Sequence, residues 1–208
     1  MKLKKKPKRI MITILVLAAF SAIGFVGYNI FIAKPEVKEA KVLKTIKKYG
    51  YTLRDNKTKR YQEMFEELDQ ILKKDPVNEE DYVEKITEMF IYDFYSLDDK
   101  TAKTDVGGTD FIYTTSLKNF LENAENTYYK YVESDVYNQR KQKLPVVDKI
   151  KIKSIEQTEF AYGDTSDPEA YEVQVSWNYT SDDFDDYQNE ATLTFIHDDI
   201  KLPLAELK

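Results

Sequence analysis

The sequence has no cysteine, a single histidine, and only six glycines and six prolines among its 208 residues. Without cysteine the chain forms no disulfide, carries no thiolate nucleophile and builds no zinc–thiolate site, and one histidine excludes every motif that needs two. A phosphate-binding glycine loop is also missing, because Gly107-Gly108 is not followed by Lys-Ser or Lys-Thr. We therefore predict no catalytic residues and no cofactor, and we interpret the protein as one that binds other molecules.

Charge is absent from Ile10 to Ala33, a run of 24 mostly apolar residues. As a helix rising about 1.5 Å per residue, the run spans about 36 Å, enough to cross a hydrocarbon layer about 30 Å thick. We predict a single transmembrane helix here. A cleaved signal peptide is one alternative, since Ala19-Phe20-Ser21 has the small-x-small pattern, but the segment stays apolar well past that point. A buried helix of a soluble protein is the other alternative.

The formal net charge of -6 is distributed unevenly along the chain. Residues 1–9 carry +6, residues 34–60 hold ten Lys and Arg against three acidic residues, and residues 61–208 carry -19. Cations flank both ends of the span, but those before it are denser, and the lack of cysteine favours a domain outside the reducing cytoplasm. We predict a bacterial cell-membrane protein with a cytoplasmic tail over residues 1–9 and an extracytoplasmic C-terminal domain. The acidity of that domain argues against nucleic acid as a partner.

Residues 34–56 are predicted to form a basic stalk helix and a linker. Apolar residues recur there at helical spacing, with lysines between them, and Gly50 ends the pattern; the apolar positions are Val37, Ala40, Leu43, Ile46 and Tyr49. The lysines have two interpretations: they contact anionic lipid headgroups, or they form a solvated face. The folded domain is expected to occupy residues 57–208.

Within that domain the hydrophobic periodicity changes from helical to alternating. Helices are predicted from about 58 to 74, from the cap at Asn78 to about 97, and from about 116 to 133. Strands are predicted around 150–153, 160–162, 171–179, 191–195 and 200–204, with the last confined to an edge by Pro203. Helices first and strands afterwards predict an α+β domain whose antiparallel sheet is covered on one face by the helices.

This order of elements, over roughly residues 78 to 208, resembles the nuclear-transport-factor-2-like, or cystatin-like, superfamily. The strand-like sequence pattern of residues 171–179 and 191–204 contributes to the resemblance. The resemblance implies a cone of bent antiparallel sheet wrapped on helices. Behind an N-terminal anchor, it is similar to the single-pass assembly factors of type IV secretion and Gram-positive conjugation systems. In those families the domain oligomerises and binds other components, without catalytic residues, whereas other superfamily members are enzymes with acid and base residues inside the cone.

Three groups of polar residues are candidates for a site. His197 precedes Asp198 and Asp199 in a predicted hairpin turn, where it is the base of a dyad, half of a metal site or a surface histidine. An acidic loop between two strands is either a calcium site or a solvated loop, and its spacing does not match an EF-hand; its residues are Asp182, Asp183, Asp185 and Asp186. Four tyrosines either anchor a partner, as tyrosine often does at interfaces, or cover their own domain; they are Tyr128, Tyr129, Tyr131 and Tyr137.

Together these features predict a single-pass, non-catalytic binding or scaffold protein, a component of a cell-envelope, conjugation or secretion complex. Its expected partners are the membrane, other membrane or envelope proteins, and a second copy of itself in a homo-oligomer. The alternative is a membrane-tethered enzyme or small-ligand-binding domain that uses a pocket between the sheet and the helices.

Overall fold

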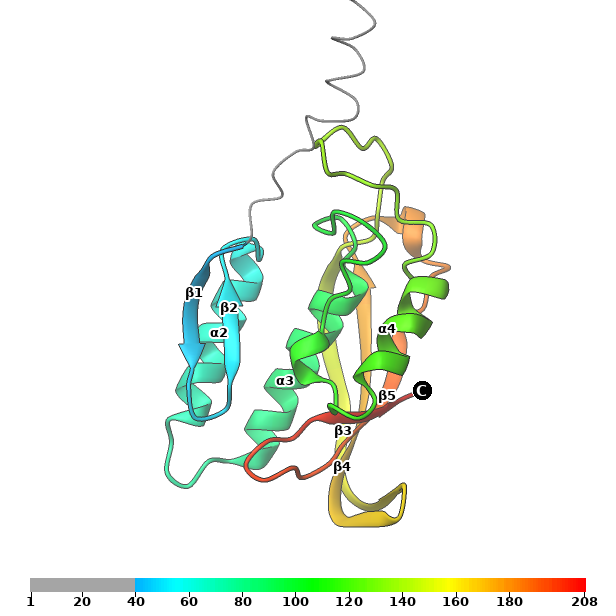
Figure 1. Cartoon of the computed structure of the whole chain (residues 1–208). Helices are drawn as coiled ribbons and strands as arrows, with labels where there is room; N and C mark the ends of the chain where they lie inside the picture. The colour runs from blue at the N-terminus through cyan, green and yellow to red at the C-terminus, as the bar shows by residue number, and fades with distance from the viewer. Residues whose placement is uncertain (1–39) are drawn as a thin grey trace, which may run out of the picture. The chain divides into compact units, whose positions relative to one another are not determined.

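A computed structural model describes residues 40–208 (Figure 1). The predicted transmembrane helix, Ile10 to Ala33, and the basic tail before it lie outside these residues. No helix between residue 40 and the C-terminus is both long and apolar enough to cross a membrane. The described residues belong to one compact unit, Glu39–Lys208.

The chain forms an α+β domain with three α-helices and two antiparallel sheets among the described residues, which confirms the predicted class. A two-stranded sheet pairs β1 with β2, and a four-stranded sheet has the order β3-β4-β5-β6. The elements in chain order are β1 Val42–Ile46, β2 Tyr51–Arg54, α2 Lys59–Leu72, α3 Glu79–Tyr95, the 3-10 helix η1 Thr109–Phe111, α4 Leu117–Asn126, β3 Val147–Tyr162, β4 Thr165–Tyr179, the 3-10 helix η2 Asp182–Phe184, β5 Glu190–Phe195 and β6 Leu204–Leu207.

The predicted stalk helix is wrong over residues 42–54, which form the β1–β2 hairpin instead. Its turn contains Gly50 with φ +70°, a conformation that glycine adopts without strain. Ile46 and Tyr49 are buried, as a helical stripe would be, but Leu43 is 55% exposed. The turn after β1 reverses the direction of the chain, so that Ile46 and Tyr49, three residues apart, are both buried. The same spacing is typical of a helix. The hairpin is part of the same compact unit as the helices.

Helix α2 begins within a residue of its predicted start, and α3 begins directly after its predicted cap, Asn78. The Thr58 hydroxyl accepts a hydrogen bond from the N–H of Tyr61 (3.2 Å), and the Asn78 side chain accepts from the N–H of Glu80 (3.0 Å). Helix α4 ends at Asn126, earlier than the predicted 133. The side chains of Asn126 and Thr127 donate to the carbonyls of the preceding turn, at 2.7 and 2.6 Å, and these bonds compete with continuation of the helix.

Helix α3 lies between α2 and the four-stranded sheet, where it contacts β3 and β4 (Figure 1). Val83, Ile86 and Met89 are fully buried, because this helix is covered on more than one side. Val173 and Val175 of β4 and Leu193 of β5 point toward it from the sheet and are also buried. The core therefore sits between α3 and one face of the sheet.

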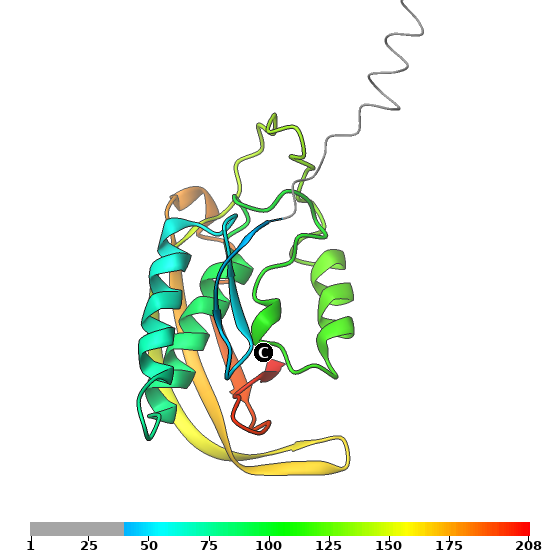
Figure 2. The same ribbon diagram turned by 60° about the vertical axis from the view of Figure 1, so that its left-hand side comes forward.

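The sheet differs from its prediction in the lengths of its strands. The predicted segments 150–153 and 160–162 are one continuous strand, β3. Strand β4 pairs with β3 along its length but with β5 only over Tyr171–Ser176, so the far end of the β3–β4 hairpin extends past the sheet (Figure 2). Strand β6 begins at Leu204 and not at Ile200, because a turn closed by an Asp198–Lys201 bridge occupies the preceding residues.

Candidate functional site

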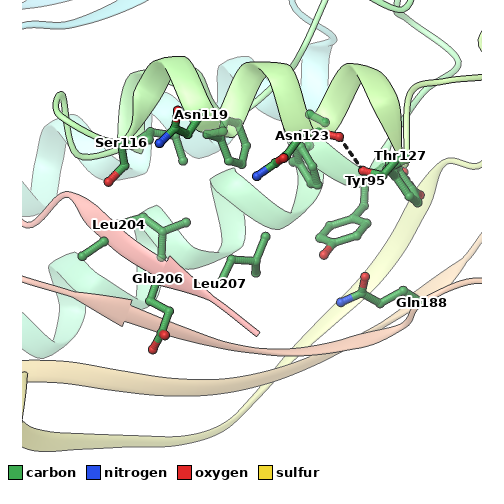
Figure 3. Close-up of a pocket in the computed structure, with 15 residues that line it drawn as sticks. Tyr95, Ser116, Asn119, Asn123, Thr127, Gln188, Leu204, Glu206 and Leu207 are labelled. Carbon is green, nitrogen blue, oxygen red and sulfur yellow. Dashed lines mark hydrogen bonds between the residues drawn. The ribbon is translucent and has the colours of Figure 1, made fainter. Parts of the chain in front are cut away.

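A groove of about 370 Å³ lies between helix α4 and the edge strand β6 (Figure 3). Its depth is apolar and includes the last residues of α3, Phe94 and Tyr95. Its rim is made of uncharged polar side chains, namely Ser116, Asn119, Asn123 and Thr127 of the α4 segment and Gln188 of the β4–β5 connection. An apolar interior with a few polar groups at the mouth is typical of binding sites in proteins. We refer to this feature as the α4–β6 groove.

Packed aromatic rings make the deep wall of the groove rigid. The ring of Phe94 contacts those of Tyr95, Phe120 and Tyr128, with centroids 4.9, 5.2 and 5.8 Å apart. Tyr95 also packs on Trp177 of β4 at 4.3 Å. The Tyr128 hydroxyl donates a hydrogen bond to the backbone carbonyl of Tyr95 at 3.1 Å. The wall is thus tied both to α3 and to the sheet, and aromatic packing of this kind adds to the free energy gained from burial.

Asp93, near the end of α3, organises a buried ionic network behind this wall. Its carboxylate binds the ammonium groups of Lys57 (2.6 Å) and Lys100 (2.9 Å), and it accepts a hydrogen bond from the N–H of Gly108 (2.8 Å). Burial alone would raise the pKa of Asp93, but the two lysines outweigh it and lower the pKa to about 2. Burial would lower the pKa of Lys100, but the carboxylates of Asp93 and Asp99 (2.8 Å) outweigh it and raise the pKa. Asp93 and Lys100 are therefore charged at neutral pH, and the network holds the loop after α3 in place.

Gly107 and Gly108 let that loop approach α3 closely. A Cβ atom at Gly107 would lie 2.0 Å from the carbonyl oxygen of Asp93, and Gly108 has φ +73°. Glycine is needed at 108 because of this backbone angle and at 107 because no side chain fits in the space. The buried Tyr129 hydroxyl accepts from the N–H of Gly107 (3.0 Å) and donates to the carbonyl of Phe94 (2.7 Å).

The fixed loop leads directly into the groove. After η1, Ile112 forms a parallel bridge with Leu204 at the start of β6, and the N–H of Tyr113 donates to the carbonyl of Leu204 (2.9 Å). Helix α4 then begins at Leu117. The loop held by the ionic network on α3 therefore runs through these contacts with β6 into α4.

His197 does not interact with its sequence neighbours as the dyad interpretation required. Its Nδ1 lies 2.9 Å from an oxygen of Asp167 in β4, and its Nε2 lies 3.4 Å from Glu79 at the start of α3. Burial lowers the pKa of His197, but the hydrogen bonds to the two carboxylates outweigh it, so that the pKa is raised. Its ring is partly buried, so the surface-histidine alternative is also incomplete.

Both ring nitrogens of His197 face carboxylates, and an imidazole donates from both only when it is protonated. The Tyr171 hydroxyl donates to the same oxygen of Glu79 at 3.0 Å. The arrangement suits a cation held between two anions, and it leaves no free nitrogen lone pair for a general base. It connects the β5–β6 turn to β4 and to α3.

The four candidate tyrosines fall into two pairs. Tyr129 is fully buried and Tyr128 is partly buried in the aromatic wall, so the prediction of a partner surface is wrong for Tyr129. Tyr131 and Tyr137 are 75% and 66% exposed. The tyrosine-rich sequence thus serves the domain's own core with one pair and the surface with the other.

The acidic loop forms the short helix η2 between β4 and β5. The Ser181 hydroxyl caps it by accepting from the N–H of Asp183 (3.3 Å), and the Asp183 carboxylate faces Lys143 at 3.3 Å. Over residues 40–208 no group of three or more His, Asp or Glu side chains is arranged to hold a metal ion. The carboxylates of Asp182, Asp183, Asp185 and Asp186 are thus not gathered into such a group, and the calcium interpretation stays a prediction from the sequence.

Comparison with known proteins adds no family to these observations. No family model matches the sequence, and neither a curated protein nor a solved structure matches it. The resemblance to the nuclear-transport-factor-2-like superfamily therefore stays a prediction. Function has to be argued from the α4–β6 groove and its surroundings.

Proposed function

We propose that the chain is a single-pass membrane-anchored, non-catalytic binding protein whose extracytoplasmic domain holds a partner in the α4–β6 groove. The uncharged run from Ile10 to Ala33 supports the anchor. The acidic domain that follows it supports an envelope setting away from nucleic acid. The partner belongs to a cell-envelope, conjugation or secretion complex, and homo-oligomers of the chain are part of the same proposal.

The fold proposed for this domain is a nuclear-transport-factor-2-like cone. Helices α2 and α3 precede a four-stranded antiparallel sheet, and the cavity lies between a helix and the sheet, as the cone arrangement requires. The β1–β2 hairpin is an addition at the N-terminal side.

The observation that carries the binding function is the groove itself. It is apolar inside, bears amide and hydroxyl groups at its mouth, and contains one charged lining residue, Glu206, which is paired with Lys208 at 2.6 Å. Its walls are fixed by buried contacts and not by long flexible side chains. A preformed site of this kind binds with little cost in conformational entropy.

The alternative function is a small-ligand-binding or catalytic domain that uses the same cavity. Its volume lies within the range typical of ligand pockets, and Tyr95, Tyr128 and Glu206 are in its lining, which favours a ligand with hydrogen-bonding groups. A catalytic version has less support, because the single histidine, His197, lies between two carboxylates and does not line the groove.

Photocrosslinking in intact cells tests the binding function. A photoreactive amino acid replaces Asn123, an exposed residue at the mouth of the groove, and in a matched control it replaces Asn178, an exposed residue on the opposite face of the sheet. We expect a protein adduct from position 123 and none of the same mass from position 178. An adduct of twice the chain's mass identifies a homo-oligomer, and a different mass identifies another component. Equal crosslinking from both positions, or none from 123, contradicts the proposal.

A further inference from the structure

We infer that the occupant of the α4–β6 groove is an extended, uncharged peptide segment of a partner protein, which adds to the free edge of β6 as a fifth strand. This inference rests on the proposed binding function and names the chemistry of the partner at the same site. Addition of a strand to an exposed sheet edge is a recurring mode of peptide recognition, in which backbone hydrogen bonds provide affinity and pockets for alternate side chains provide specificity.

The edge of β6 has backbone groups available for such pairing. Lys208 and Thr192 exchange two backbone hydrogen bonds of 2.9 Å, so the neighbouring pair, Leu207 and Leu193, is of the non-hydrogen-bonded type. In an antiparallel ladder the N–H and C=O groups of such a pair point away from the partner strand. The groups of Leu207 therefore point out of the sheet at the groove, and no described strand pairs with that edge.

The chain itself already pairs with the first residue of this edge. Ile112 forms a parallel bridge with Leu204, and the N–H of Tyr113 donates to the carbonyl of Leu204 at 2.9 Å. The chain then turns away into α4, and the groove opens alongside the rest of β6 (Figure 3). A bound peptide would continue the pairing from the point where residues 112–113 leave the edge.

The two walls of the groove fit a strand with alternating side chains. Successive side chains of a strand point to opposite sides. One set would enter the apolar depth at Phe94 and Tyr95, and the other would meet the amides of Asn119 and Asn123 on α4. The single charged lining residue, Glu206, is already paired with Lys208, so an uncharged segment fits better than a charged one.

The opposite edge of the sheet lacks these properties. Strand β3 is also an edge strand, but it carries exposed lysines at alternate positions, Lys149, Lys151 and Lys153. Lysines on an edge strand are a common device against pairing with another chain. The pocket that reaches β3, at Lys153, is lined mostly by polar and charged side chains, whereas the α4–β6 groove has an apolar interior and a single charged residue, Glu206. The site of strand addition is therefore β6.

The test uses the full chain in lipid nanodiscs and heptapeptides selected on it from a random display library. A selected peptide is then synthesised in three forms. One is unmodified, and the other two are N-methylated at every second residue, each in one of the two possible registers. N-methylation removes backbone donors and keeps the side chains. We expect the form methylated on the edge-facing residues to bind at least about tenfold more weakly, and the other register to bind like the unmodified peptide. Equal binding of all forms overturns the inference.

Two variants of Leu207 provide the reciprocal test. Leu207→Pro removes the outward N–H and leaves the pairing of its neighbours with β5 intact, since an edge strand tolerates proline where its N–H faces outward. Leu207→Ala is the matched control, because it shortens the side chain and keeps the N–H. We expect the proline variant to bind the selected peptide about tenfold more weakly than the alanine variant, at equal unfolding temperature. If the proline variant fails to fold, the methylated peptides decide alone.

The remaining outcomes separate this inference from the proposed function. If a partner crosslinks at position 123 in cells but peptide binding is insensitive to N-methylation, the proposed binding function holds and strand addition is overturned. An Asn123→Trp variant tests whether a selected peptide depends on the groove. If no selected peptide loses binding in this variant, strand addition is also overturned. A small molecule that occupies the groove without any peptide binding would assign the site to the alternative function.

Discussion

Gly107→Ala should destabilise the domain strongly, although it adds a single carbon atom. The new Cβ would lie 2.0 Å from the carbonyl oxygen of Asp93, and that oxygen belongs to the backbone of α3 and cannot rotate away. To reach ordinary contact at 3.4 Å, the loop must move by about 1.4 Å. Such a shift breaks the hydrogen bonds from Gly108 to Asp93 and from Gly107 to Tyr129.

The size of the effect follows from these contacts. A hydrogen bond to a charged group contributes about 1.5–3 kcal/mol and a neutral one about 0.5–1.5 kcal/mol. Overpacking adds about 1–3 kcal/mol. We therefore expect a loss of about 3–7 kcal/mol in the free energy of unfolding, a large part of the roughly 5–15 kcal/mol of a typical domain. Gly163→Ala is the matched control: this glycine has φ +61° but open space around it, so the cost is limited to about 1–2 kcal/mol.

Urea unfolding of the full chain in mild detergent measures both variants. Trp177 is the only tryptophan and is 2% exposed, so its fluorescence reports unfolding of the core. A difference between the two variants of less than about 1 kcal/mol would refute the argument that the close approach of this loop to α3 fixes it.

Three further predictions concern buried polar groups. The pKa of the single histidine, His197, measured by NMR, should lie above its usual 6.5 and should fall in the Asp167→Asn variant. The stability that this histidine contributes is fully present below about pH 6.5 and is lost as the pH rises through the pKa of the folded state. Asp93→Asn should cost about 3–5 kcal/mol in urea unfolding, because it removes the buried anion shared by Lys57 and Lys100 and leaves Lys100 with Asp99 alone. Tyr129→Phe should cost about 1–3 kcal/mol, because the N–H and the carbonyl bonded to its hydroxyl are left unpaired.

Exposed side chains supply the controls. Lys118→Met and Tyr131→Phe change side chains that are 85% and 75% exposed, and each should alter the free energy of unfolding by less than about 0.5 kcal/mol. A His197 pKa at or below 6.5 would contradict the arrangement in which its ring lies between the carboxylates of Asp167 and Glu79. Variants of Asp93 and Tyr129 that match these controls would contradict the structural role of the network.

Local signals in the sequence predicted the elements that depend on local interactions. Thr58 and Asn78 cap their helices through side chains a few residues away, and alternation from 171 to 179 reflects one buried and one open face. The hairpin at residues 42–54 was missed because Ile46 and Tyr49 are three apart, a spacing that a strand followed by a tight turn shares with a helix.

The parts of the site that were missed depend on contacts between distant residues. Asp93 lies on a helix whose sequence gives it the appearance of a solvated residue, yet Lys57 and Lys100 meet it from two other segments. His197 and Asp167 are 30 residues apart and meet only because β4 and β5 pair. The groove depends on where α4 stands relative to β6, which no periodicity in the sequence encodes.

Cysteine accessibility in intact cells tests the central claim, a partner held in the groove of an extracytoplasmic domain. The chain has no cysteine, so Asp183→Cys and Asn123→Cys each introduce a unique thiol. With a membrane-impermeant maleimide, we predict that the thiol at 183 is labelled without lysis and that the thiol at 123 is labelled more slowly in cells than in the purified chain. Labelling at 183 only after lysis would contradict the compartment. Equal rates at 123 in cells and in the purified chain would contradict the bound partner.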